Sequence, residues 1–175
     1  MQFKELFANE TSRANTDYVK DIIYQKPELY QELFELVLEN EEPYSRRAIW
    51  VFDSCDEEIP GVAIPFLPRL IDNLEKFEHD GLKRHSLRIL SRHVIPEKQT
   101  VVVLNFCFKM LTLFEAAAIK VHAMQILYEI SQKEPDLKPE LISAIEMAIQ
   151  EGTAGVKNRG DKMLKKLRKE IKEIC

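Results

Sequence analysis

The sequence has few of the residues on which common catalytic and ligand-binding motifs depend. Only five of its 175 residues are glycine, three are cysteine and four are histidine. None of the patterns GxxxxGK[ST], GxGxxG and GxSxG occurs, so no phosphate-binding loop or nucleophile elbow is expected. The histidines lack HExxH spacing and the cysteines lack CxxC spacing. The sequence therefore predicts no catalytic residue, no metal site and no cofactor.

Long uncharged apolar runs are also missing. No stretch approaches 18 such residues, so we expect no membrane-spanning segment, and residues 1–6 carry charges where a signal peptide needs an apolar run. A formal net charge of −4 argues against general attraction to nucleic acid or anionic membranes. Cys55 and Cys107 fall at apolar positions and are expected to be buried thiols. We expect a cytoplasmic protein with no membrane partner.

What the sequence does have is a repeat of 37 to 38 residues. The small residues Ala48, Ser86, Ala123 and Gly160 are spaced 38, 37 and 37 apart. Apolar residues follow each of them at helical spacing, and a leucine stands nineteen positions before each. These leucines are Leu29, Leu67, Leu104 and Leu141. A fixed period of this length predicts an array of helical repeats, with each small residue marking a close approach by a neighbouring helix.

Each repeat is expected to contain two helices, A and then B, so the predicted fold class is all-α. Proline stands near the first turn of three of the four A helices, where its missing N–H costs nothing. The expected A helices are 27–40, 63–78, 100–115 and 137–150, and the expected B helices are 44–55, 81–94, 118–132 and 155–172. We predict one continuous domain, made of a helical cap at 1–25 and repeats at 26–60, 61–98, 99–136 and 137–175.

The third A helix is the least regular of these. Residues 100–103 are β-branched and would also suit a strand. Leu104 and Phe108 lie in phase with the apolar positions of the other repeats, which favours a helix with both side chains in the core.

The start of each B helix resembles the HEAT-repeat consensus: an apolar residue, then Lys or Arg, then a small residue three positions later. Ile119-Lys120-x-x-Ala123, Val156-Lys157-x-x-Gly160 and Leu82-Lys83-x-x-Ser86 follow it, whereas Tyr44-Ser45-x-x-Ala48 has serine at the basic position. The resemblance covers residues 26–172. It implies an armadillo-like, right-handed superhelix of four to five helical hairpins with the B helices on its concave side, and it implies no particular activity.

The B helices are predicted to show mainly basic side chains to solvent, at positions one before, two after and six after the small residue. The A helices carry more acidic residues. This segregation predicts a basic strip for binding an acidic protein or peptide, while ordinary solvation of exposed helix faces explains the same charges. The predicted partner-binding residues are Arg47, Trp50, His85, Arg88, Arg92, His122, Arg159 and Lys162.

Trp50 is the only tryptophan, and it falls nearly opposite the apolar stripe of its helix. It is either an exposed contact residue or is covered by the N-terminal cap. Trp50, Asp53 and Arg88 are similar in kind to the residues of HEAT-like DNA alkylation-repair glycosylases, but Ser54 stands one turn after Trp50 and those enzymes are longer. The sequence thus predicts a non-catalytic, monomeric scaffold for a protein partner. Nucleic-acid backbone binding through the same strip is the alternative, and a homodimer through the strip is a third hypothesis.

Overall fold

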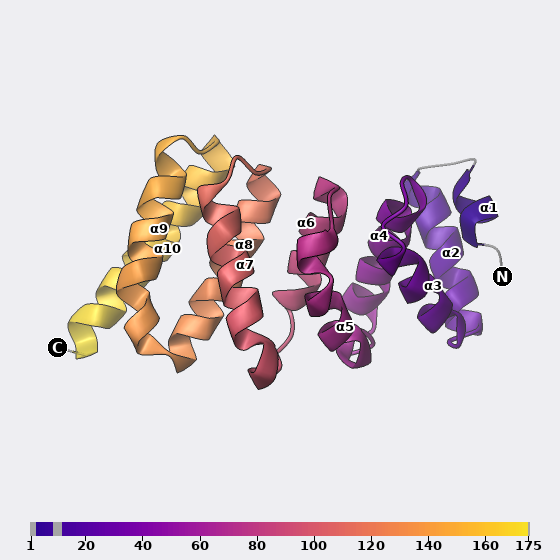
Figure 1. The fold of residues 1–175 in the computed structure, drawn as a ribbon, viewed down its shortest axis with the longest axis horizontal. Helices are drawn as coiled ribbons and strands as arrows, with labels where there is room; N and C mark the ends of the chain where they lie inside the picture. Colours follow the sequence, from indigo (N-terminus) through magenta and orange to yellow (C-terminus); the bar gives the residue numbers. More distant parts are fainter. Residues whose placement is uncertain (1–2, 9–11, 175) are drawn as a thin grey trace. The chain divides into compact units, whose positions relative to one another are not determined.

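The computed structural model describes residues 3–8 and 12–174. Ten α-helices and four short 3-10 helices make up this part of the chain, which contains no strand, so the predicted all-α fold is confirmed. The helices gather into two compact units, residues 1–93 and 94–175 (Figure 1). The right-handed superhelix with the B helices on its concave side stays a prediction.

The unit of residues 1–93 contains the cap and the first two repeats. Its helices are α1 (Phe3–Ala8), α2 (Arg13–Gln25), α3 (Leu29–Leu38), α4 (Tyr44–Glu58), α5 (Leu67–Asp72) and α6 (Asp80–Leu90). The B helix α4 is central, because it contacts α1, α2, α3 and α6. The range 1–25 predicted for the helical cap contains the helices α1 and α2.

The A helix of the second repeat is not the continuous helix expected at 63–78. It consists of a 3-10 turn (Ile64–Phe66), the six-residue α5 and a second 3-10 turn (Leu74–Lys76). Pro65 and Pro68 remove two backbone donors in the first turns, and Asn73 ends α5 with its side chain donating to the Arg69 carbonyl at 2.8 Å. Gly61, at φ 91°, makes the turn that leads from α4 into this segment.

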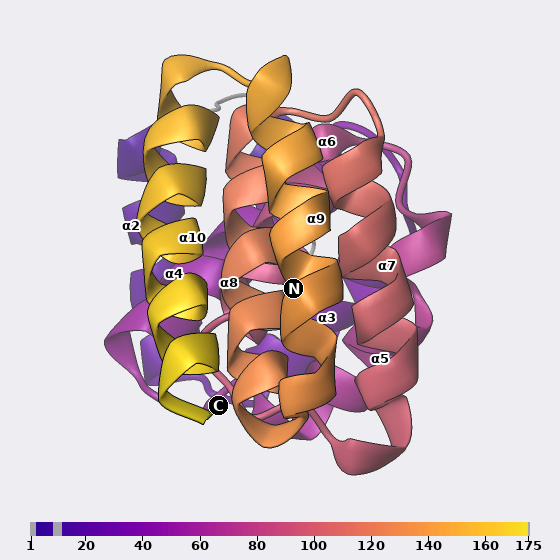
Figure 2. The same cartoon turned by 90° about the vertical axis from the view of Figure 1, so that its left-hand side faces the viewer.

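The unit of residues 94–175 contains four regular helices. These are α7 (Thr100–Thr112), α8 (Ala117–Lys133), α9 (Lys138–Gln150) and α10 (Ala154–Ile174). The A helices α7 and α9 contact each other, as do the B helices α8 and α10, and the two layers pack through α7–α8 and α9–α10 contacts (Figure 2). No helix in the described part of the chain is long and apolar enough to cross a membrane.

The small residues of the repeat are buried as expected. Ala48, Ser86 and Ala123 have no exposed surface, and Gly160 is also buried. A Cβ atom added to Gly160 would lie 2.3 Å from Cγ2 of Ile149 on α9, far inside van der Waals contact. The close approach predicted from the small residue is therefore confirmed at this position.

The core register of the third A helix differs from the prediction. Leu104 and Phe108 are only half-buried, whereas Val103, Phe106, Cys107 and Met110 form the buried face of α7. The equivalent leucines of the other repeats, Leu29, Leu67 and Leu141, are buried as predicted. The helix assignment was correct, but α7 is rotated so that its core positions precede the repeat register by one residue.

Four aromatic rings form the core beside α4. Tyr30 and Phe34 of α3, Phe52 of α4 and Phe66 pack with ring centroids 4.3–5.5 Å apart. Cys55 and Cys107 are buried free thiols, as predicted. Burial raises the pKa of Cys55 to about 12, so its thiol stays protonated and unreactive at neutral pH.

Candidate functional site

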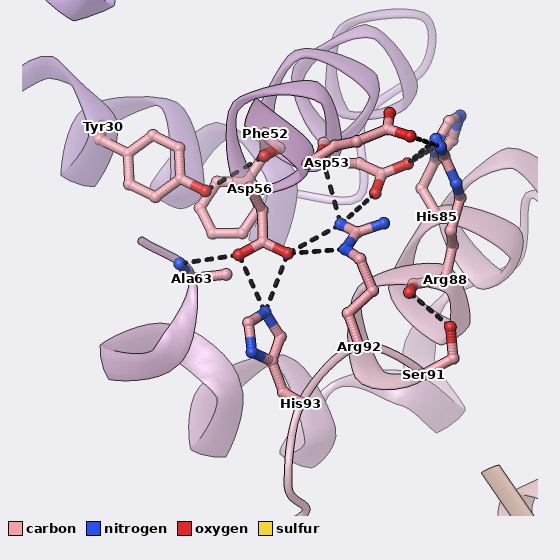
Figure 3. A network of polar contacts seen from close by, with 11 residues as sticks. Tyr30, Phe52, Asp53, Asp56, Ala63, His85, Arg88, Ser91, Arg92 and His93 are labelled. Carbon is pink, nitrogen blue, oxygen red and sulfur yellow. Dashed lines mark hydrogen bonds and ion pairs between the residues drawn. The ribbon is translucent and has the colours of Figure 1, made fainter. Parts of the chain in front are cut away.

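The contact between α4 and α6 contains a cluster of buried charges. Asp53 and Asp56 are three residues apart on α4, so their carboxylates project from the same face. His85, Arg88 and Arg92 follow one another at helical spacing on α6 and just beyond it, and their side chains reach toward these carboxylates (Figure 3). The side chains of both aspartates are 0% exposed.

Asp53 accepts hydrogen bonds from three residues. His85 Nδ1 lies 2.6 Å and Arg88 Nη1 lies 2.9 Å from Oδ2, while Arg92 Nη2 lies 2.6 Å from Oδ1. Arg84 Nη2 lies 3.1 Å from His85 Nε2, and an arginine can only donate, so Nε2 is the acceptor. The two ring nitrogens of His85 therefore face Asp53 on one side and Arg84 on the other.

Asp56 continues the cluster toward the end of α4. Arg92 Nη2 donates to its Oδ2 at 2.7 Å, so the guanidinium of Arg92 lies between the two carboxylates (Figure 3). His93 Nε2 lies 2.9 Å from both oxygens, and the Ala63 amide donates to Oδ1 at 3.2 Å. Arg88 Nη2 donates a hydrogen bond to Glu57 Oε1 at 2.6 Å. Each buried oxygen thus has at least one donor.

The cations around Asp53 keep it ionised despite its burial. Burial alone would raise the pKa of Asp53, but the hydrogen bonds from His85 and Arg92 outweigh it and hold the pKa below its usual value. Burial alone would lower the pKa of Arg92. The hydrogen bonds to Asp53 and Asp56 outweigh this effect and raise the pKa above its usual value. The ionised Asp53 and the guanidinium of Arg92 therefore attract each other across the contact and fix α4 against α6.

The predicted binding residues of this unit are consequently not a free basic strip. His85 was expected to face solvent but is buried, because Asp53 draws it into the helix contact. Arg88 and Arg92 are partly exposed, with their charge opposed by carboxylates. Arg47 and Trp50 are half-buried, and the Nε and Nη1 atoms of Arg47 have no hydrogen-bond partner among the described residues.

In the unit of residues 94–175 the corresponding contact between α8 and α10 has one neutral acceptor, Gln125, and one carboxylate, Glu170, that is less deeply buried than Asp53 and Asp56. Arg159 is half-buried, and its Nη2 donates to the side-chain oxygen of Gln125. Tyr128 donates to Glu170 at 2.6 Å, and Lys166 Nζ lies 5.2 Å from the centre of the Tyr128 ring. His122 is half-buried, while Lys162 is exposed and has no ion pair with any described residue.

The pairing of these carboxylates with α6 was not predicted from the sequence. Asp53 was considered only beside Trp50 and Arg88, and Asp56 lies beyond the expected helix end at Cys55, whereas α4 extends three residues further. A usable signal was present: Asp53 and Asp56, three residues apart on one B helix, precede Arg88 and Arg92 by 35 and 36 residues, which is close to the repeat length. In an array of repeats, that offset places opposite charges in adjacent helices.

The chain is thus an all-α protein built from repeated helical hairpins. The model of the HEAT repeat domain family matches residues 3–167, and the protein belongs to this family. No match was found among curated proteins or among solved structures. The matched range includes the cap helix α1, so the family assignment covers nearly the whole described chain.

Family membership defines a general role. A HEAT repeat domain is a helical-repeat scaffold that often mediates protein interactions, and the family is generally non-catalytic. No group of three or more His, Cys, Asp or Glu residues within 3–8 and 12–174 is arranged to hold a metal ion. The fold does not fix the function, which depends on the side chains at the surfaces of the B helices.

Proposed function

We propose that the protein is a non-catalytic scaffold that binds an acidic protein or peptide partner through solvent-facing residues of its B helices. The observation that carries this proposal is the exposed, unpaired charge of Lys162 on α10. Arg88 occupies the same repeat position on α6 but has two carboxylate partners. Position by position, the chain uses some B-helix cations to hold helices together and leaves others open to a partner.

The state of the buried carboxylates supports the non-catalytic part of the proposal. A general base must be within reach of its substrate. Asp53 and Asp56 have fully buried side chains, and the cations of α6 occupy their oxygens. These carboxylates therefore serve the packing of α4 on α6 rather than proton transfer.

The same ion pairs favour a protein over a nucleic acid as the partner. Phosphate backbones are bound mainly by cations that neutralise phosphates. In the unit of residues 1–93 the charges of Arg88 and Arg92 are already opposed by internal carboxylates, and His85 is buried. Trp50 is half-buried on α4 beside Arg47, so it offers aromatic surface for a protein contact.

Site-specific photo-crosslinking in cells tests which face is used. A crosslinking amino acid is placed at Trp50 or Lys162 on the B helices, and at Gln31 or Ser143 on exposed parts of the A helices as matched controls. We expect protein adducts from the B-helix positions only. The crosslinked protein is then purified and its affinity measured for the wild type, Lys162→Glu and the control Lys26→Glu.

A tenfold or greater loss of affinity is expected for Lys162→Glu, with little change for Lys26→Glu, which alters the net charge equally. Adducts that form only at Gln31 or Ser143 would contradict the proposed face. Adducts of nucleic acid at Lys162, with affinity falling by about 0.9 log units per log unit of salt for each phosphate contact, would favour the alternative.

A further inference from the structure

The C-terminal helix α10 carries a one-sided lysine surface. Its apolar side, with Val156, Met163, Leu164 and Leu167, is buried, and the helix contacts α8 and α9. The opposite side carries exposed lysines, among them Lys162, Lys165, Lys169 and Lys172 at steps of three or four residues and Lys166 next to Lys165, and this spacing places them on one face. This lysine face consists of Lys162, Lys165, Lys166, Lys169 and Lys172.

Most of this positive charge has no internal partner. Lys162, Lys165 and Lys172 form no hydrogen bond or ion pair with another described residue. Lys169 lies 3.7 Å from Glu173, and Lys166 lies over the Tyr128 ring. The whole helix has eight Lys and Arg against three Asp and Glu. Like charges at this spacing repel one another, so the lysine face does not stabilise the helix that carries it.

Ordinary solvation of an exposed helix face does not account for so large an excess of positive charge. A terminal repeat needs a polar outer face, and a mixture of both signs supplies one at no repulsive cost. The N-terminal cap has such a mixture. Arg13 pairs with Asp17 at 3.2 Å, Lys20 pairs with Asp17 at 3.1 Å, and Lys4 pairs with Glu39 at 2.8 Å. The excess of positive charge on α10 points instead to an external anion.

The chemistry of the face selects the kind of anionic partner. Lysine offers compact point charges on flexible stems, whereas recognition of bases uses arginine forks and exposed aromatic rings. The arginines of α10 are engaged, Arg159 with Gln125 and Arg168 with Glu146, and the Tyr128 ring is half-buried beneath Lys166. The face can therefore neutralise carboxylates in a row but has no group free to read or stack on bases.

The spacing of the lysines matches that of a second helix. At 1.5 Å per residue, steps of three and four residues separate the lysines by about 4.5–6 Å along the axis. Glutamates at i, i+3 and i+7 of a partner helix repeat with the same steps, so charges stay opposed along the contact. Building on the proposed scaffold function, we propose that the lysine face of α10 docks an acidic helical segment of the protein partner.

Fluorescence anisotropy with a defined probe tests this assignment. The probe is a labelled, helix-forming 21-residue peptide of alanine and glutamate with glutamates at three- and four-residue spacing, titrated with the full chain at 50 and 150 mM salt. The test variant is Lys162→Gln/Lys165→Gln/Lys172→Gln, since glutamine keeps helix propensity close to that of lysine. The control, Lys26→Gln/Lys98→Gln/Lys133→Gln, removes the same charge from exposed lysines elsewhere.

We expect the α10 variant to weaken binding about tenfold and the control to change it less than twofold, because each surface pair contributes modestly. Equal losses in both variants would show attraction to net charge alone and overturn the proposal. So would a 20-nucleotide DNA that binds more tightly than the peptide and depends on the same lysines. If crosslinks at Trp50 identify a partner whose affinity is unchanged in the α10 variant, this inference fails while the scaffold function stands. If no B-helix crosslink forms, the scaffold function fails, whatever the peptide does.

Discussion

In the unit of residues 1–93, the B helices α4 and α6 meet through buried carboxylates and the cations that neutralise them. In the unit of residues 94–175, α8 and α10 meet through the neutral acceptor Gln125 and the partly exposed carboxylate Glu170. Five positions after the small residue stands Asp53 in α4 and Tyr128 in α8. Two positions after it stands Arg88 in α6, bonded to Asp53, and Lys162 in α10, free in solvent. Equivalent positions of the repeat thus carry paired charges in one unit and an exposed charge in the other.

The charge balance of the two units follows the same division. Residues 1–93 contain 12 Lys and Arg against 18 Asp and Glu, a formal charge of −6, whereas residues 94–175 contain 13 against 11, a charge of +2. In the acidic unit Arg88 and Arg92 are bound to carboxylates, so they contribute to packing. In the other unit Lys162, Lys165 and Lys172 have no such partner among the described residues, so their charge stays exposed to solvent. Predictions that remove one member of each arrangement test this comparison.

The largest effect is expected for Asp53→Ala. It would leave His85, Arg88 and Arg92 without their shared carboxylate in a buried contact, and breaking one partner of a buried ion pair costs about 3–5 kcal/mol. Urea denaturation of the full chain measures the free energy of unfolding. Tyr128→Phe, at the equivalent position of α8, serves as the matched variant and should cost about 1 kcal/mol. Equal losses would remove the difference between the two contacts.

The sequence predicted the repeats that contain this cluster but not the contacts within it. The repeat period and the buried small residues followed from spacing, since Ala48, Ser86 and Ala123 recur in phase and a repeat buries the same position each time. The hydrogen-bond partners of His85 could not be predicted from this spacing. A histidine beside an apolar stripe was expected to face solvent, and the adjacent helix, which carries Asp53, makes that position a buried one.

The next effect concerns the repeat register. Leu67→Ala should cost about 2–5 kcal/mol, since Leu67 is 2% exposed and its removal leaves a cavity. Leu104→Ala, at the equivalent position of α7, should cost about 1–2 kcal/mol because that side chain is half-buried. Thermal and urea denaturation of both variants give the comparison. A cost for Leu104→Ala as large as for Leu67→Ala would restore the register predicted from sequence and contradict the rotation of α7.

The rotation of α7 has a local reason that spacing cannot supply. Its sequence carries apolar residues at 101–104, 106–108 and 110–111, so several adjacent faces could become the core. The period alone favoured Leu104 and Phe108. The packed helix instead buries Val103, Phe106 and Met110, and periodicity becomes uninformative when apolar residues surround much of a helix.

A smaller effect is expected from Glu170, which joins α10 to α8 and α9. Burial raises its pKa, but hydrogen bonds from Tyr128, Lys138 and Gln132 outweigh this and lower the pKa to about 2. The unfolded value is about 4.3, so the stabilisation is fully present above that pH and is lost as pH falls toward 2. Because solvent reaches part of the side chain, we expect about 1–2 kcal/mol.

Glu170→Gln provides the measurement, since glutamine does not titrate. The difference in unfolding free energy between wild type and variant should be constant from pH 7 to about 5 and should shrink between about pH 4.3 and 2. Glu146→Gln is the control: it removes the charge of a carboxylate that also pairs with a cation, Arg168, but is more exposed than Glu170. A difference that is unchanged at pH 2.5 would show that the carboxylate of Glu170 is not held in its charged form by its neighbours.

The smallest effect on stability is expected for Lys162→Gln, and it completes the comparison. Lys162 is exposed and unpaired, so the substitution should change the free energy of unfolding by less than about 0.5 kcal/mol, with a slight gain where repulsion from Lys165 and Lys166 is relieved. Arg88→Gln, at the same repeat position, removes the bonds to Asp53 and Glu57 and should cost at least about 1 kcal/mol more. Chemical denaturation of the two variants under one set of conditions measures this difference directly. If Lys162→Gln is as destabilising as Arg88→Gln, the charge of α10 serves the fold. If Lys162→Gln is neutral for folding but weakens partner binding, its charge is reserved for interaction, because a residue kept at no benefit to stability must contribute elsewhere.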